Sequence, residues 1–254
     1  MNREVSENKF ENEAKEVLVV NDIQSIYNTR YAEQDGPKIE EAKRQARKFV
    51  SRCMKHVLSP AQRFSSILDL GCGNGTKTYW LKDYSDAVLG VDISQTGVSQ
   101  ARRVCDRQGI EYRVMDVGKD MLERRYACIT SFGLSTTNLD RVEDVASLIV
   151  SYIRRYGEER TTYVYFSKTD FTGHNPGWKY YSHSELRGLL SLLHQNPEID
   201  ETKTIFFLPK DIELDYGHPV HRLALAVFQG LSRLRHHKAY RLPFITIIKA
   251  CRQN

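Results

Sequence analysis

The stretch that most constrains the fold of this chain covers residues 66–78, with the sequence Ser-Ile-Leu-Asp-Leu-Gly-Cys-Gly-Asn-Gly-Thr-Lys-Thr. Its apolar first part predicts a short buried strand, and Gly71, Gly73 and Gly75 follow at once. Glycine turns without a Cβ penalty and lets a ligand approach the main chain closely. A helix candidate comes next, and strand, glycine turn and helix in that order form the first unit of a doubly wound nucleotide-binding sheet.

Three further apolar runs lie downstream, and the first two end in an acid, Asp92 and Asp116. The runs cover residues 88–92, 112–116 and 127–131. In nucleotide-binding sheets a ribose-binding carboxylate is expected roughly 20 residues beyond the glycines. Asp92 lies close to this spacing. Ligands of open parallel sheets bind outside the carboxyl ends of the strands. We therefore expect Asp69, Asp92 and Asp116 to converge on one crevice.

This order of motifs resembles the class I S-adenosylmethionine-dependent methyltransferases. Their first motif has the form apolar-x-Asp-apolar-Gly-x-Gly-x-Gly, which residues 67–75 match, and the resemblance covers residues 66–168. It implies an α/β fold, with a doubly wound, Rossmann-like, seven-stranded sheet whose last strand is antiparallel, in three α/β/α layers. It also implies S-adenosyl-L-methionine as the cofactor.

The resemblance assigns roles to the strand-end acids and to the glycine loop. The loop 71–75 passes under the methionine part of the cofactor, and Asp69 helps to hold the loop and the amino group. Asp92 takes both ribose hydroxyls, since one carboxylate accepts two donors, and Asp116 takes the adenine amino group. The residues expected at the cofactor are Arg30, Tyr31, Asp69, Gly71, Cys72, Gly73, Asn74, Asp92, Ile93, Asp116, Val117 and Phe132.

Two other nucleotide sites fit less well. The dinucleotide-binding fingerprint needs its third glycine at position 76, because the helix packs closely on the strand there. This sequence has Thr76 instead. A phosphate loop needs glycine followed directly by Lys and Ser or Thr, whereas Lys77 comes one residue late and the remaining spacing is wrong. A methyl donor is the favoured ligand.

Composition sets the class of protein. The chain has 254 residues, of which 41% are hydrophobic and 27% charged, as in ordinary soluble globular proteins. No stretch approaches the roughly 20 apolar residues of a membrane span, and no secretory signal opens the chain, so a cytoplasmic location is expected. The five cysteines form no CxxC pair and no Cys/His cluster, and no metal is expected. A net charge of +5 mildly favours an anionic partner without deciding for nucleic acid.

We expect residues 1–254 to form a single methyltransferase domain. Residues 1–60 would be an N-terminal helical cover, and residues 61–168 the cofactor-binding core. Residues 169–254 would be an acceptor-side half, with a helical insertion between the last two strands at 209–243. Further helices are predicted over residues 38–58, 94–105, 138–156, 182–193 and 218–237, and further strands over 161–167, 204–208 and 244–250.

Two flanking segments leave their roles open. In residues 23–32, Tyr27 and Tyr31 would share one helix face, either as a cover over the cofactor or as packing aromatics. Arg30 is a candidate partner for the methionine carboxylate. The helix 218–237 would either cover the sheet, act as a lid over the acceptor, or meet phosphates or lipid.

Methyl transfer is a direct displacement, so the first task of the protein is alignment, worth up to about 7–11 kcal/mol. A hydroxyl acceptor gains a further 10²–10⁴ from a base that removes its proton. His174, in the rim loop 168–181, is the leading candidate for this base, and His183 is the second. His218 and His221 are further candidates, and the sequence leaves the choice open.

The class of acceptor is predicted from a motif that the sequence lacks and from the aromatic residues in the segments that flank the core. The Asn/Asp-Pro-Pro-aromatic motif of enzymes that methylate nucleic-acid amines is missing, since residues 131–135 read Ser-Phe-Gly-Leu-Ser. We therefore expect an O- or N-methyltransferase for a small molecule, in the biosynthesis of a natural product or a modified sugar, with no nucleic-acid partner and a possible homodimer. The alternatives are an RNA or protein methyltransferase that uses the basic segment 233–241, and a non-catalytic cofactor-binding scaffold.

Overall fold

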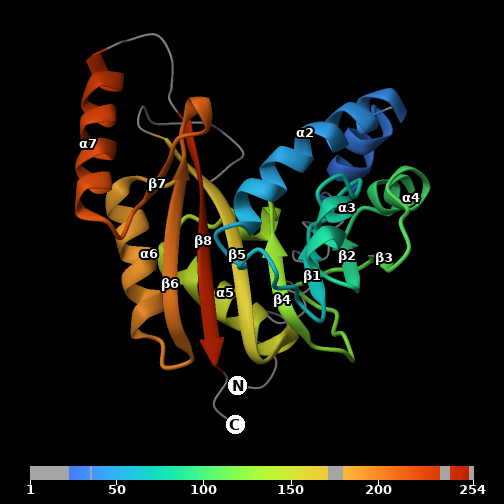
Figure 1. Ribbon diagram of the computed structural model, residues 1–254. Coiled ribbons are helices and arrows are strands. Elements are labelled where there is room, and N and C mark those ends of the chain that lie inside the picture. The colour runs from blue at the N-terminus through green and yellow to red at the C-terminus, as the bar shows by residue number, and fades with distance from the viewer. Residues whose placement is uncertain (1–22, 35, 171–179, 235–240, 252–254) are drawn as a thin grey trace, which may run out of the picture.

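An eight-stranded sheet forms the centre of the molecule, with the strand order β3-β2-β1-β4-β5-β8-β6-β7 (Figure 1). The computed structural model describes residues 23–34, 36–170, 180–234 and 241–251. The strands are β1 Ile67–Leu70, β2 Val88–Asp92, β3 Ile110–Val114, β4 Tyr126–Ser131, β5 Gly157–Asp170, β6 Ile199–Phe207, β7 Glu213–Asp215 and β8 Arg241–Cys251.

The pairing of the strands confirms the predicted fold class. Strands β1 to β5 pair in parallel, and β8 lies antiparallel between β5 and β6. The sequence analysis predicted seven strands, whereas β7 is an eighth that pairs with β6 inside the insertion. Because β7 is only three residues long, it carries too little periodicity to be recognised in a sequence.

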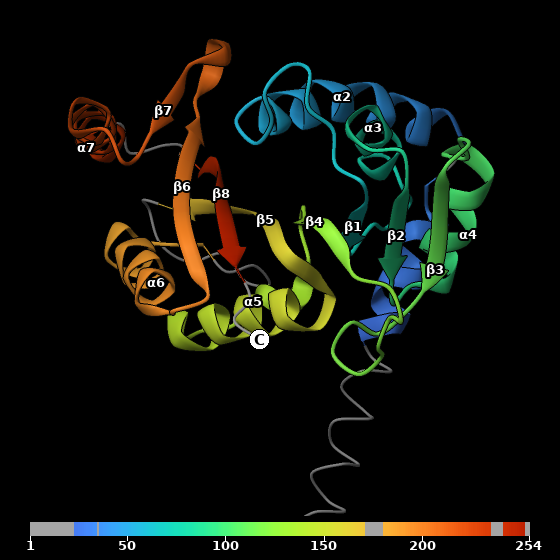
Figure 2. The same ribbon diagram turned by 60° about the horizontal axis from the view of Figure 1, so that its bottom comes forward.

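Helices cover both faces of the sheet. They are α2 Gly36–Met54, α3 Thr78–Leu81, α4 Gln95–Val104, α5 Val142–Tyr156, α6 His183–Gln195 and α7 Pro219–Leu234. Figure 2 shows α2 and α3 on one face and α5 and α6 on the other. In β1, Ile67 packs in the cluster with α2, whereas Leu68 and Leu70 pack in the cluster with α5. Burial on both faces explains why apolar side chains point to both sides of this strand, with Asp69 as its one polar residue.

Two elements show how local chemistry and pairing set the boundaries. Ser182 begins α6 with a capping box, in which its hydroxyl accepts from the Glu185 N–H and the Glu185 carboxylate accepts from the Ser182 N–H. Strand β5 extends beyond the predicted 161–167 because β8 pairs with it along residues 160–170. Continuous hydrogen bonding along a neighbour therefore lengthens a strand beyond its apolar centre.

The insertion lies at the far edge of the sheet, where α7 packs beside β7 (Figure 1). The exposed side chains of α7 include Val220, Leu223 and Val227, whereas Leu225 is buried. In the part of the chain that the structure describes, no helix combines the length and apolar character needed to span a membrane.

Basic side chains on α2 and just after it clamp the insertion to the N-terminal part of the chain. The contacts are Lys48 Nζ to Asp211 Oδ2 at 2.9 Å, Arg52 Nε to Glu213 Oε1 at 2.9 Å, Lys55 Nζ to Glu213 Oε2 at 2.7 Å and His56 Nε2 to Glu213 Oε2 at 2.7 Å. Two segments outside the sheet core, far apart in the sequence, are thereby joined.

Candidate active site

The glycine turn after β1 has the geometry that its residue types predict. Gly71, Gly73 and Gly75 adopt φ values of 73°, 55° and 77°, in the left-handed region that favours glycine. A Cβ on Gly73 would lie 2.2 Å from the Tyr31 hydroxyl, and a Cβ on Gly75 would lie 2.8 Å from Ala101 Cβ. The turn therefore accepts close neighbours from the N-terminal segment and from α4.

Asp92, at the carboxyl end of β2, fixes this turn. Its Oδ2 accepts from the Gly73 N–H and its Oδ1 from the Ser94 N–H, both at 2.8 Å. Burial raises the pKa of Asp92, and these two backbone donors act in the opposite direction. Each carboxylate oxygen has two lone pairs, so each retains capacity for a ligand hydroxyl.

Asp69, which the sequence analysis expects to help hold the loop, lies beneath the turn. Its Oδ2 accepts from Thr78 Oγ1 at 2.6 Å and its Oδ1 from Thr130 Oγ1 at 2.8 Å. The carboxylate is buried, which raises its pKa, while the two hydroxyls lower it. Asp69 therefore ties α3 and β4 to β1 beneath the turn, and it is absent from the lining of the two cavities that adjoin the turn.

These two cavities adjoin one another, since both are lined by Tyr27, Tyr31, Gly71 and Gly133. The smaller is also lined by Asp92, Ile93, Met115, Asp116, Val117 and Leu134. The larger has a volume of about 580 Å³ and is lined by Arg30, Phe49, Cys72, Asn74, Lys77, Phe132, Phe166, Lys168 and Tyr180, among others. Of the twelve residues expected at the cofactor, Asp69 and Gly73 line neither cavity.

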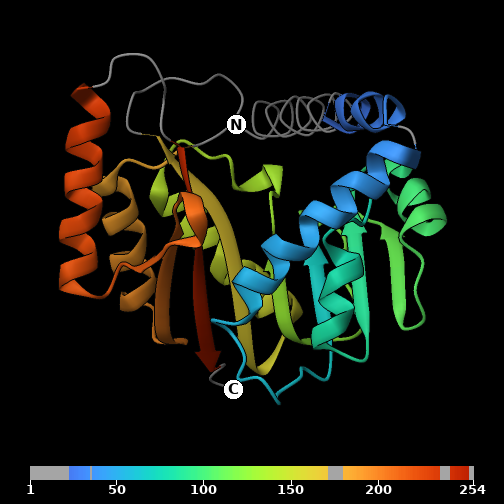
Figure 3. The ribbon, with the colours of Figure 1, turned by 45° about the horizontal axis from the view of Figure 1, so that its top comes forward.

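The tyrosine-rich segment forms a helix over residues 23–32 that lies beside α4 (Figure 3). Side-chain amides and a serine hydroxyl tether it to the loop after β2, to α4 and to the glycine turn. The bonds run from Gln24 Nε2 to the Ile93 carbonyl at 2.9 Å, from Ser94 Oγ to Asn28 Oδ1 at 2.7 Å, from Gln100 Nε2 to the Tyr31 carbonyl at 2.6 Å, and from Asn74 Nδ2 to Gln34 Oε1 at 2.6 Å.

This arrangement agrees with the interpretation of the helix 23–32 as a cover. Tyr31 lies between the glycine turn and α4, where a Cβ on Gly97 would meet its ring at 2.9 Å. Burial raises the pKa of the Tyr31 hydroxyl, and the nearby Asp92 raises it further. The tethering amides Gln24, Gln34 and Gln100 were missed in the sequence, because isolated polar residues on a helix carry no signal of their partner.

Three cations, Arg30, Lys77 and Lys168, line the larger cavity. Lys77 is only partly exposed, and burial lowers the pKa of its ammonium group; Asp69 acts in the opposite direction, whereas Arg30 and Lys168 lower it further. The sequence analysis considered Lys77 only as a phosphate-loop lysine and did not consider Lys168. Their convergence depends on the order of the strands, which brings the end of β5 next to the glycine turn.

None of the candidate bases that the structure describes, His183, His218 and His221, lines either cavity. His174 lies in 171–179, outside the described residues. His183 packs instead between Phe206 and Tyr216, with ring centroids 6.3 Å and 5.8 Å away, and burial lowers its pKa. His221 accepts a hydrogen bond from the Asp215 N–H at 3.0 Å, at the start of α7. The assignment of a histidine base therefore stays a prediction.

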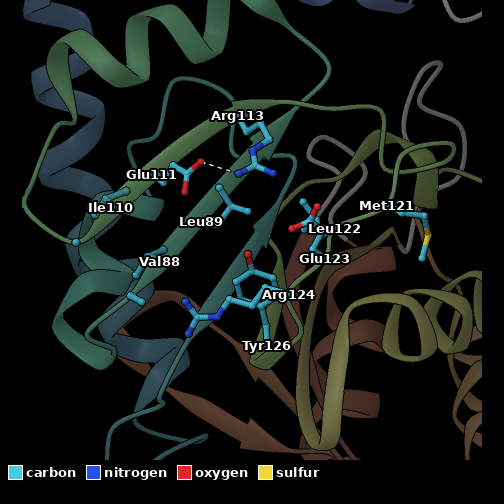
Figure 4. A pocket seen from close by; sticks show the side chains of 12 residues that line it. Val88, Leu89, Ile110, Glu111, Arg113, Met121, Leu122, Glu123, Arg124 and Tyr126 are labelled. Carbon is cyan, nitrogen blue, oxygen red and sulfur yellow. Dashed lines mark hydrogen bonds and ion pairs between the residues drawn. The ribbon is translucent and has the colours of Figure 1, made fainter.

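A third cavity, of about 670 Å³, lies beside β2 and β3 (Figure 4). Residues 115–125, all of them described, connect β3 to β4 without a helix, and Met121, Leu122, Glu123 and Arg124 of this connection line the cavity. Its lining includes Leu89, Met121 and the ion pair between Glu111 and Arg113, at 2.8 Å. None of the residues of the glycine turn lines it. Among the described residues, no group of three or more His, Cys, Asp or Glu side chains is arranged to hold a metal ion.

Comparison with known proteins identifies the central part of the chain. Residues 67–157, from β1 to the start of β5, match the family model described as a methyltransferase domain. These residues form a methyltransferase domain. Among curated proteins, no sequence matches the chain.

Solved structures of other methyltransferases share the fold of this methyltransferase domain and of much of the chain around it. The N-methyltransferase NodS from Bradyrhizobium japonicum WM9, in complex with S-adenosyl-L-homocysteine, has a TM-score of 0.53 and 12% identity, over 82% of this chain and 87% of its own. The plantazolicin methyltransferase BpumL, in complex with a monoazolic desmethylPZN analogue and SAH, has a TM-score of 0.54 and 13% identity, over 93% and 98%.

A Haemonchus contortus N-methyltransferase, in complex with phosphomonomethylethanolamine and S-adenosylhomocysteine, has a TM-score of 0.54 and 12% identity, over 81% of this chain and 53% of its own. At these identities the likeness establishes the fold. Together with the family match, it confirms the class I methyltransferase assignment made from the sequence. These findings agree with S-adenosyl-L-methionine as the cofactor, which the sequence analysis expected.

Proposed function

We propose that this chain transfers a methyl group from S-adenosyl-L-methionine to an oxygen or nitrogen atom of a small organic acceptor. The observation that carries the proposal is the pair of adjoining cavities at the carboxyl ends of the parallel strands, one acidic and one aromatic and basic. Ligands of this kind of sheet bind at that edge. Two cavities that meet at the glycine turn suit a donor and an acceptor that must touch.

The residues of the smaller cavity fit the adenosine part of the donor. Asp92 has free lone pairs for the ribose hydroxyls, and Asp116 stands at the end of the next strand for the adenine amino group. Ile93 and Val117 supply apolar surface for the base. The methionine part would extend past Gly71 towards Arg30, whose guanidinium suits a carboxylate. Tyr31 would close this part of the site from above.

The chain's own contribution to the reaction is alignment and exclusion of water. The donor supplies an activated methyl group on a sulfonium. The turn held by Asp92 and the cover helix held by its amide tethers fix the two partners against one another, and orientation of this kind is worth up to about 7–11 kcal/mol. The rings of Phe49, Phe132 and Phe166 make an apolar wall beside the turn. They favour a compact organic acceptor.

An acceptor screen with labelled S-adenosyl-L-methionine tests the proposal. We expect saturable binding of the donor product S-adenosyl-L-homocysteine by calorimetry, and transfer of label to one class of small acceptors. Binding without transfer to any small molecule, RNA or protein would favour a non-catalytic scaffold. Transfer to RNA or protein alone would favour the alternative that uses residues 233–241, most of which (235–240) lie outside the described residues.

Four expectations about the whole protein stay proposals alongside this one. They are the single-domain organisation of residues 1–254 with its cover, core and acceptor-side half, the cytoplasmic location, the absence of a nucleic-acid partner, and a possible homodimer. Size-exclusion chromatography with light scattering tests the last of these, since a dimer doubles the mass of 29.4 kDa.

A further inference from the structure

The larger cavity has an uneven distribution of charge. Arg30 from the cover helix, Lys77 from the glycine turn and Lys168 from β5 line it, and no acidic side chain is among its described lining residues. The structure gives none of these three cations an ion pair or a side-chain hydrogen bond to another described residue. The three groups line the same cavity, and the charges of Arg30 and Lys168 both lower the pKa of Lys77.

Charge balance indicates what this cluster of three cations lacks. Asp69 beneath the turn is the buried acid that acts on Lys77, and its two oxygens are already held by threonine hydroxyls. The carboxylate of a bound methyl donor can match one cation, and Arg30 stands on the cover helix for that role. The donor's ammonium and sulfonium groups add positive charge. Asp69 attracts Lys77 from beneath the turn, but no acidic side chain among the described lining residues faces the partly exposed Lys77 and the exposed Lys168 inside the cavity. Their positive charges repel one another there.

The apolar part of the same cavity limits the shape of the missing partner. Phe49 of α2 packs edge-on against Phe132, with ring centroids 5.3 Å apart, and against Phe166, at 5.0 Å. All three rings line the cavity beside Lys77 and Lys168. A ligand that fits this surface has a flat or apolar body and an anionic group at one end.

We propose that the acceptor is a small organic acid, whose carboxylate or phosphate is held by Lys77 and Lys168 while its apolar body lies against Phe49, Phe132 and Phe166. This inference rests on the proposed function, because it gives the smaller cavity and Arg30 to the donor. It narrows the acceptor from any small molecule to an anionic one. It also gives the cover, the turn and β5 a common role in selecting the acceptor.

Calorimetry with matched probes tests the inference on the full chain saturated with S-adenosyl-L-homocysteine. The probes are benzoate, phenyl phosphate and the neutral benzamide, which has the shape of benzoate. We expect both anions to bind saturably and benzamide to bind at least tenfold more weakly. Lys77→Gln and Lys168→Gln should each raise the Kd of the anions about tenfold, since each removes a charge-assisted contact. Lys249→Gln on β8, where the lysine pairs with Glu201 of β6 at the surface, should leave the Kd of the anions unchanged.

The affinity for S-adenosyl-L-homocysteine, measured first in every variant, separates the two proposals. A wild-type chain that does not bind it contradicts the proposed function. If the wild-type chain binds S-adenosyl-L-homocysteine but binds benzamide as tightly as benzoate, or binds neither anion, the inference is wrong. The proposed function is then unaffected. The inference is also wrong if Lys77→Gln weakens the binding of S-adenosyl-L-homocysteine and leaves the binding of the anions unchanged. Lys168→Gln changes an exposed side chain, so its result does not depend on folding.

Discussion

Tyr31 and Gly73 depend on each other at the scale of single residues. The tyrosine hydroxyl occupies the place where any other residue type at position 73 would carry its Cβ. The positive φ of Gly73 adds a second reason for glycine, because the left-handed region costs other residues about 1–2 kcal/mol. The sequence motif therefore encodes a contact with the cover as well as a turn.

Replacement of this glycine should affect the donor site before it affects the fold. We expect Gly73→Ala to push Tyr31 away from the turn and to weaken binding of S-adenosyl-L-homocysteine at least tenfold in calorimetry. The matched control is Gly188→Ala in α6, where the nearest atom to the new Cβ is 3.5 Å away and alanine favours the helix. Equal donor affinity in the two variants would argue against the close contact.

Lys77 leads to a prediction about pH. Its pKa lies below the ordinary 10.5 because of burial, with Asp69 from β1 and Cys53 from α2 opposing this effect and Arg30 and Lys168 adding to it. An anion needs the charged ammonium group, which is present below this pKa and lost above it. We therefore expect the affinity for benzoate to fall as pH rises towards 10.5, and to fall much less in Lys77→Arg. A flat profile in the wild type would contradict the assignment of Lys77.

The clamp between α2 and the insertion matters at the scale of elements. Partial burial acts to raise the pKa of Glu213, but hydrogen bonds from Lys55, Arg52 and His56 outweigh it and lower the pKa from 4.5 to about 2. A carboxylate with a lowered pKa stabilises the folded state above its unfolded pKa, and this contribution disappears as pH falls towards the folded value. The clamp should therefore weaken between about pH 4.5 and pH 2.

Glu213→Gln tests the clamp through stability against pH. We expect the variant to have a lower Tm than the wild type at pH 7, and a smaller further loss of stability between pH 4.5 and pH 2. The control is Glu201→Gln, whose pair with Lys249 is about half exposed on both sides and is expected to contribute little. Parallel pH profiles for the wild type and Glu213→Gln would show that the contacts do not join α2 to β7 in solution.

The helix 23–32 leads to a prediction about donor release. Its tethers to Ile93, Ser94 and Gln100 hold it beside both cavities. We expect removal of residues 1–34 to speed the dissociation of S-adenosyl-L-homocysteine in stopped-flow measurements, while circular dichroism retains the signal of the sheet core. An unchanged dissociation rate would mean that the helix packs beside the site without closing it.

The whole molecule shows what the sequence could and could not predict. Alternation of apolar runs with helical patterns predicted the parallel core, because β1, β2 and β4 are buried on both faces. The glycines that end the strands and helices are local signals that a sequence shows directly. Strand β7 and the direction of Asp69 were beyond reach, since three residues carry no period and the partners Thr78 and Thr130 come from different elements. Lys77 and Lys168 line one cavity because the sheet places β5 two strands from β1. Side chains brought together in this way depend on the order of the strands in the sheet, which the spacing of residues along the sequence does not reveal.

The central claim is that the crevice at the ends of β1, β2 and β3 binds the methyl donor through Asp92. Calorimetry of S-adenosyl-L-methionine with the wild type, Asp92→Ala and the exposed control Asp86→Asn tests it most directly. Loss of two charge-assisted hydrogen bonds, at about 1.5–3 kcal/mol each, should weaken binding by about 10²–10⁴ in Asp92→Ala, whereas Asp86→Asn should match the wild type. An Asp92→Ala variant that folds and binds the donor with unchanged affinity would contradict the account.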